Sequence, residues 1–72
     1  MDRFEAQQRF EVARSAYDAY RARAFPVFAE LVTPELSADD PEVQAELERL
    51  RVEMHAAEEA LVAAFREHRQ TG

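Results

Sequence analysis

Apolar residues in this chain recur at steps of four and three residues, and this spacing constrains the fold more than any other feature of the sequence. In the first half the series is Ala6, Phe10, Ala13, Tyr17, Tyr20, Ala24, Val27 and Leu31. In the second half it is Val43, Leu47, Leu50, Met54, Ala57, Leu61, Ala64 and His68. A helix places such a series on one face, whereas a strand requires alternation every second residue. The sequence therefore predicts an all-α fold of two amphipathic helices with heptad-like apolar stripes.

Each predicted helix has its own start signal. Asp2 followed three residues later by Glu5 matches a capping box, which predicts a helix from residue 3. Asp40 before Pro41 and Glu42 matches an N-cap with a proline in the first turn, which predicts a second helix from residue 41. The two apolar stripes therefore belong to two separate helices.

Pro26 interrupts the first apolar series. A proline inside a helix lacks the amide donor, and its ring clashes with the carbonyl four residues earlier, here that of Ala22. The series nevertheless continues past the proline to Leu31. We therefore expect a first helix over residues 3–32 with a kink or break near residues 22–26.

The segment TPELSADDP separates the two helices and carries two prolines together with several turn and cap formers. It predicts a connector over residues 33–40, followed by the second helix over residues 41–69. Two helices joined by so short a connector form an antiparallel helical hairpin, roughly 40 Å long at about 1.5 Å per residue. We expect residues 1–72 to form this single domain.

The small size of the chain predicts self-association. A domain of 72 residues buries only about 60% of the surface of its unfolded chain, and its core supplies roughly 3 to 5 kcal/mol. The sequence has no cysteine for a disulfide, so pairing of two hairpins into a homodimeric four-helix bundle is the expected way to cover the stripes. The predicted self-association residues are Phe10, Ala13, Tyr17, Tyr20, Leu31, Leu47, Leu50, Met54, Leu61 and Phe65.

Acidic residues concentrate between Glu30 and Glu48, where the sequence has seven of them and no basic residue. One interpretation is a docking tip for a basic partner surface, because a local field speeds encounter and selects orientation. The other is that acids cap a helix N-terminus and keep a loop solvated. Phe25 and Phe28, beside the proline, could add an aromatic knob or pocket. The predicted partner-binding residues are Phe25, Phe28, Glu35, Asp39, Asp40, Glu42 and Glu46.

No metal or cofactor site is expected. His55 with Glu58 and Glu59 reverses the order of the Glu-x-x-His pattern of metal-binding bundles, and the heptad places it away from the apolar stripe. The acidic segment lacks the alternating ligands and the glycine of a calcium loop. His68 is expected to be an interface histidine, with a weak pH switch as the alternative.

Catalysis is not expected, because the sequence shows no nucleophile and base at a meaningful spacing and its only glycine is Gly72, which excludes phosphate-binding loops. Arg14 and Arg21 share one flank of the first helix and could touch phosphate. Their acidic neighbours and the net charge of -6 favour salt bridges at the edge of a dimer over direct nucleic-acid binding.

No apolar run reaches the roughly 20 residues that cross a bilayer, and the charged start lacks the apolar core of a signal peptide. We therefore expect a soluble, cytoplasmic protein that does not act at a membrane.

These features together predict a noncatalytic protein-protein interaction module, an adaptor, assembly factor or regulator, which self-associates through its heptad faces and presents an acidic tip. The alternative is a small acidic inhibitor of another enzyme, of the immunity or phage counter-defence type, that occupies a basic or nucleic-acid-binding groove. Salt discriminates between them, because binding of an inhibitor through acids should weaken strongly between about 50 and about 500 mM salt.

Overall fold

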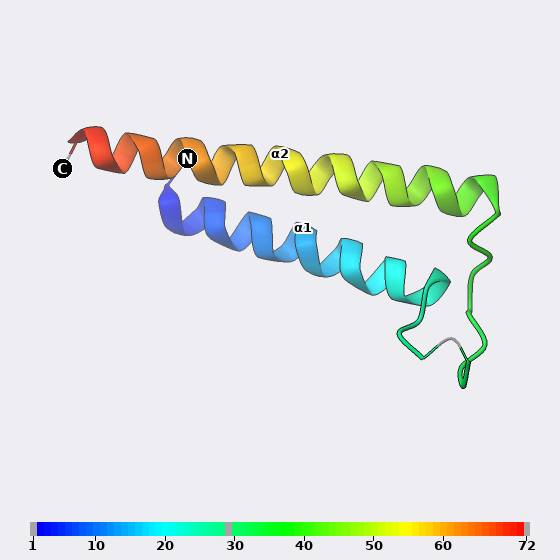
Figure 1. The fold of residues 1–72 in the computed structure, drawn as a ribbon. Helices are drawn as coiled ribbons and strands as arrows, with labels where there is room; N and C mark the ends of the chain where they lie inside the picture. The colour runs from blue at the N-terminus through cyan, green and yellow to red at the C-terminus, as the bar shows by residue number, and fades with distance from the viewer. Residues whose placement is uncertain (1, 29, 72) are drawn as a thin grey trace.

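The structure, a computed structural model, describes residues 2–28 and 30–71, with side chains up to Glu67. It consists of helix α1 (Arg3–Ala24), a connector and helix α2 (Pro41–Thr71). The two helices pack side by side and antiparallel, so that the start of α1 lies beside the last third of α2 (Figure 1). The predicted all-helical hairpin is confirmed. His68, the last position of the second apolar series, lies outside the residues whose side chains are described.

The hairpin is elongated and its two helices differ in length. Its principal extents are 51 × 23 × 13 Å and its radius of gyration is 15.8 Å, against about 11 Å for a compact domain of this size. The 31 residues of α2 span about 46 Å, so α2 runs beyond the start of α1 and the molecule exceeds the expected length of roughly 40 Å. Within the described ranges, neither helix combines the length and apolar run that a bilayer crossing requires.

Helix α1 ends earlier than the sequence predicts. The break falls at Ala24, inside the expected range, but the helix does not resume, so the predicted continuation to residue 32 is wrong. Phe25 has φ -131° and ψ 72°, outside the helical region, because the ring of a following proline disfavours the helical conformation. Beyond Pro26 the chain forms a turn in which the amides of Leu31 and Val32 both donate to the carbonyl of Phe28, each at 2.9 Å. The connector therefore covers residues 25–40 instead of 33–40.

The two helix starts differ in their capping. At α1, Asp2 is extended but its side chain makes no capping hydrogen bond, so the predicted capping box does not form although the helix begins at residue 3. At α2, the carboxylate of Asp40 accepts a hydrogen bond from the amide of Glu42 at 2.9 Å, as an N-cap does. The predicted cap of α2 is therefore confirmed, and it fixes where the connector ends.

The seam between the helices is narrow and filled by small side chains. The buried residues of α2 recur every seven positions, and they are Val43, Leu50, Ala57 and Ala64. Two alanines of α1, Ala6 and Ala24, complete the buried set. Among the described residues no large side chain is fully buried. The apolar stripes therefore face each other, as predicted. Four of the six buried positions in the described part of the chain are alanines, so the core has little volume.

Candidate functional site

The predicted self-association residues fall into three groups. Leu50 is buried in the seam, and seven others are half-buried along it, namely Phe10, Ala13, Tyr17, Tyr20, Leu47, Met54 and Leu61. Phe65 is 42% exposed, and the guanidinium of Arg3 lies 5.6 Å from the centroid of its ring. Leu31 is not on the seam, because α1 ends before it, and its side chain is 85% exposed in the connector. The structure therefore removes Leu31 from the helix face on which the sequence places it.

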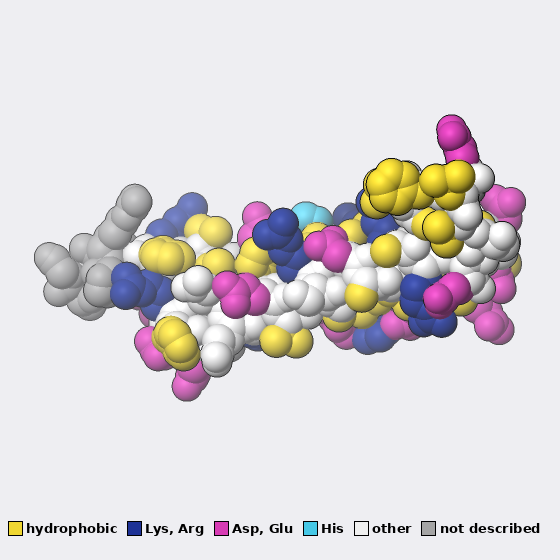
Figure 2. Space-filling view, turned by 90° about the horizontal axis from the view of Figure 1, so that it is seen from below, with side chains coloured by type: hydrophobic (Ala, Val, Ile, Leu, Met, Phe, Trp, Pro, Cys, Tyr) yellow, Lys and Arg dark blue, Asp and Glu magenta, His cyan; other side chains and the backbone are white. Residues whose placement is uncertain are grey.

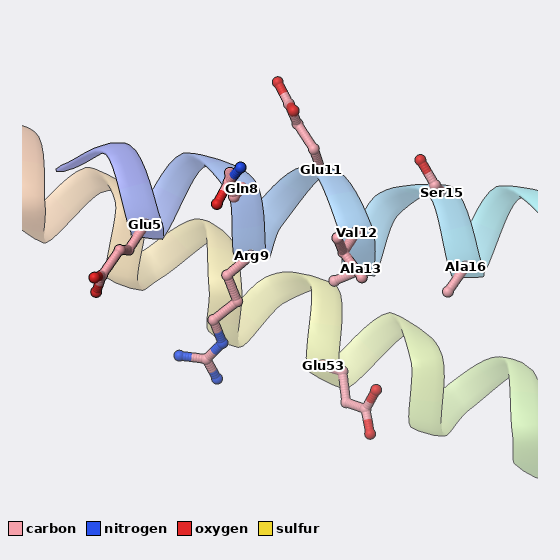
Figure 3. A pocket seen from close by; sticks show the side chains of 9 residues that line it. All are labelled: Glu5, Gln8, Arg9, Glu11, Val12, Ala13, Ser15, Ala16 and Glu53. Atoms are coloured by element: carbon pink, nitrogen blue, oxygen red, sulfur yellow. The ribbon is translucent and has the colours of Figure 1, made fainter. Parts of the chain in front are cut away.

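One side of the seam is an open groove, which we call the seam groove. Figure 3 shows Arg9 of α1 and Glu53 of α2 extending to the same side of the two helices. Glu53 accepts a hydrogen bond from Arg49 at 2.6 Å, whereas Arg9 makes no ion pair with any described residue. The lining of the seam groove comprises Glu5, Gln8, Arg9, Glu11, Val12, Ala13, Ser15, Ala16 and Glu53.

The connector exposes a second cluster of apolar side chains, which we call the connector tip. It consists of Phe25, Val27, Phe28, Leu31 and Val32. Figure 2 shows hydrophobic side chains gathered at this end of the molecule, with acidic side chains beside them. A small concavity in the tip is lined by Val27, Phe28, Glu30 and Leu31. Of the predicted partner-binding residues, Phe25 and Phe28 are both exposed here.

Three contacts hold the connector against the end of α1. Nε of Arg23 donates to a carboxylate oxygen of Glu35 at 2.9 Å. The amide of Leu36 donates to the carbonyl of Arg23 at 3.1 Å. The guanidinium of Arg21 lies 5.8 Å from the ring centroid of Phe25. Contacts of Arg21 and Arg23 thus hold the connector against α1. The apolar side chains of the connector are exposed to solvent.

The acidic segment is less uniformly charged than the sequence predicts. Arg23 pairs with Glu35, Arg49 with Glu46, and Arg51 with Glu48, so arginines from outside residues 30–48 compensate three of the seven acids. The other four make no ion pair in the described part of the chain, and they are Glu30, Asp39, Asp40 and Glu42. The uncompensated charge therefore lies on the connector and the first turn of α2.

Two glutamates of α2 have perturbed ionisation. Hydrogen bonds from Arg49 lower the pKa of Glu46, and hydrogen bonds from Arg51 lower the pKa of Glu48. The same bonds raise the pKa of each arginine. Nε of Arg51 donates to a carboxylate oxygen of Glu48 at 3.0 Å. The two residues are three positions apart, so their side chains are neighbours on the helix surface. These exposed pairs favour the helical conformation of α2 while the carboxylates are ionised.

The stabilising effect of these pairs should disappear in acid. Because the pKa of Glu48 is lowered in the folded state, its contribution is present above the usual pKa of a glutamate and is lost as pH falls through the lowered value. Glu48→Gln should therefore lower the Tm at about pH 7 but not at about pH 2. The measurement is thermal unfolding by circular dichroism, with Glu59→Gln, an exposed acid without an ion pair in the described residues, as the control. A Glu48→Gln effect that is the same at both pH values would contradict this assignment.

The residues considered for metal or phosphate binding are engaged in exposed helix-surface contacts. Nδ1 of His55 lies 3.8 Å from a carboxylate oxygen of Glu58. Within the described residues there is no group of three side chains that could hold a metal ion. Arg14 lies 3.7 Å from Asp18 on the same helix. For His55 the contact agrees with the predicted solvated histidine in a salt-bridged face, whereas Arg14, which was expected to form salt bridges at a dimer edge, pairs within its own helix.

The sequence patterns did not predict that Val27 and Val32 belong to an exposed cluster, or that Val12 and Ala16 line a groove. A signal for the first existed, because Pro26 and Pro34 bracket a mostly apolar segment too short for a long helix. No comparable signal marks the groove, since Val12 and Ala16 lie beside the stripe.

Comparison of the chain with models of protein families, with curated proteins and with solved structures gives no match.

Proposed function

We propose that this chain is a noncatalytic protein-protein interaction module, an adaptor, assembly factor or regulator, that pairs with a second copy into a four-helix bundle and presents its connector end to another protein. The observation that carries the proposal is the sparse core. Among the described residues, the buried ones are four alanines, Val43 and Leu50, while the large seam side chains stay partly in water. Covering them requires a second apolar surface.

The exposed area is consistent with one missing partner. An 8.3 kDa chain folded as a compact monomer exposes about 4,600 Å², whereas this hairpin exposes 5711 Å². The difference of about 1,100 Å² exceeds the about 800 Å² that each partner buries in a typical stable interface. One additional hairpin, burying about 800 Å² of this chain, would cover most of that difference.

We place the second copy along the open side of the seam, on the seam groove, whose lining includes Ala13 of the predicted self-association residues. Val12, Ala13 and Ala16 supply its apolar lining, and its charged lining comprises Arg9 and the three glutamates Glu5, Glu11 and Glu53. In a two-fold dimer each patch meets its own copy, so Arg9 of one hairpin can oppose Glu53 of the other. The two Arg9–Glu53 pairs that this symmetry allows would offset part of the repulsion among the glutamates of the two grooves.

Sedimentation equilibrium tests the self-association directly. We expect a mass twice the 8.3 kDa of the chain at micromolar concentration, with little change on raising the salt because apolar contacts dominate. Ala16→Arg should reduce the mass to that of the monomer while circular dichroism still shows helix, because residue 16 is exposed in the single hairpin. A wild-type mass of one chain at these concentrations would exclude the dimer.

Ala56→Arg is the matched control. Ala56 is an exposed alanine of α2 that does not line the groove, so the same substitution there should leave the dimer mass unchanged. If both variants dissociate the dimer equally, the effect comes from added charge and not from the groove.

The acidic inhibitor remains a second candidate because Glu30, Asp39, Asp40 and Glu42 carry no compensating ion pair within the described residues. These acids would face a basic cleft on the target enzyme. Binding to such a target should weaken steeply with salt, whereas the dimer should not.

A further inference from the structure

We propose that the connector tip binds a basic amphipathic helix of a partner protein, with the apolar stripe of that helix on Phe28 and Leu31 and its basic side chains facing the uncompensated acids. This inference rests on the proposed interaction function and specifies the class of partner. It does not depend on the dimer, because the tip lies at the end of the hairpin and the seam groove lies along α1 (Figures 1 and 3).

The apolar side chains of the tip are too exposed to serve the fold. Val27 is 88% exposed, Phe28 67% and Leu31 85%, and all three line the same small concavity. Scattered exposed apolar residues are ordinary, but a contiguous group on a short connector marks a contact surface. The cluster therefore offers an exposed apolar anchor site.

The tip is also held in position before any partner arrives. The Arg23–Glu35 ion pair and the Leu36–Arg23 backbone hydrogen bond tie the connector to α1. Phe28 accepts two amide hydrogen bonds through its carbonyl, which closes the turn that carries Leu31. Such ordering lowers the entropic cost of binding, since less of the connector has to be immobilised in the complex.

The acidic residues around the cluster indicate which kind of apolar partner surface binds there. Glu30 lines the concavity, and Asp39, Asp40 and Glu42 lie on the same end of the hairpin without an ion pair to any described residue. A second tip would bring like charges together, and an anionic membrane would be repelled for the same reason. Basic side chains beside an apolar stripe complement both features.

The form of the partner follows from the backbone. The connector has no strand among its described residues, so it offers no edge to which a partner strand could add. An amphipathic helix places apolar side chains every three or four residues and charged ones on both flanks, which matches a compact apolar patch beside acids. A basic amphipathic helix is therefore the occupant that fits.

The test uses a fluorescent synthetic peptide of about 18 residues, built from leucine and lysine so that it forms a basic amphipathic helix. Fluorescence anisotropy against the full-length chain should show saturable binding that weakens with salt. Phe28→Ser should weaken it about tenfold, because an aromatic anchor is lost. Phe4→Ser is the matched control, since Phe4 is 66% exposed on α1, away from the tip, and it should change binding less than about twofold.

Three outcomes would overturn the proposal. One is equal weakening by Phe28→Ser and Phe4→Ser, which would mean nonspecific attraction to an acidic protein. Another is unchanged affinity in both Phe28→Ser and a second variant, Leu31→Ser, with circular dichroism confirming that each is folded. The third is Phe28-dependent co-sedimentation with phosphatidylserine vesicles, which would identify a membrane as the occupant.

Sedimentation of the same samples separates this inference from the dimer. Phe28→Ser should keep the mass of the wild type while losing peptide affinity. Ala16→Arg should keep peptide affinity while losing the dimer. Loss of peptide binding in Ala16→Arg would show that the site needs two copies, which would overturn the proposal that the connector tip acts independently of the dimer.

Discussion

Leu50→Ala is expected to leave most of the chain unfolded at 25 °C. Leu50 is the largest buried side chain of the seam, at 8% exposure. Removing a buried leucine costs about 2 to 5 kcal/mol, because apolar contact is lost and the surroundings refill the cavity only in part. A domain of this size has only roughly 3 to 5 kcal/mol from its own core. In urea unfolding followed by circular dichroism, the helical signal of the variant without urea should be far below that of the wild type.

Leu31→Ala is the matched control for this experiment. Both leucines lie on the apolar series that the sequence assigns to the helix faces, and only the structure distinguishes them. Because Leu31 is 85% exposed in the connector, its replacement should change the free energy of unfolding by no more than about 0.5 kcal/mol. A loss as large as that of Leu50→Ala would mean that the first helix face does continue past Pro26.

The second helix shows what periodicity can predict. Its apolar stripe predicts which face of the helix packs, and Asp40 before Pro41 predicts where the helix begins. Both predictions depend on local geometry alone. The pattern also predicts that the first helix packs through Ala6 and Ala24, and both are buried. These features are local, so one sequence is enough to define them.

The end of the first helix shows where periodicity fails. Val27 and Leu31 extend the stripe in sequence, but Pro26 stops the helix and the apolar residues beyond it turn outward. The competing rules were both visible in the sequence, and the proline constraint is the stronger because it removes a donor and adds a clash. The exposed cluster at the connector tip is the direct consequence.

Charge compensation at the tip also depends on tertiary structure. Glu35 is twelve residues from Arg23, and the pair forms only because the connector folds back along α1. A count of charges along the chain treats such a glutamate as uncompensated. Glu30 and Asp39 remain so in the described residues, and the structure therefore locates the electrostatic feature more narrowly than composition does.

Ala57→Glu should abolish folding of the hairpin. Ala57 has no exposed surface and lies midway along α2, where the two helices approach each other across small side chains. A glutamate there must either bury an unpaired carboxylate or force the helices apart, and losses of this kind reach about 3 to 5 kcal/mol. That equals the stability of a small core, so the far-ultraviolet circular dichroism should fall toward that of an unfolded chain.

Ala56→Glu isolates the cause of that loss. It makes the same exchange one position earlier on the same helix, with the same change in charge and helix propensity, but Ala56 is exposed. We expect its free energy of unfolding to remain within about 0.5 kcal/mol of the wild type. If the two variants unfolded alike, added negative charge on an acidic protein would explain both, and the close approach of the helices at Ala57 would not be needed. A difference of several kcal/mol, in contrast, can arise only if residue 57 sits where a second helix leaves no room for a side chain, which is the packing on which the sparse core and the open seam groove depend.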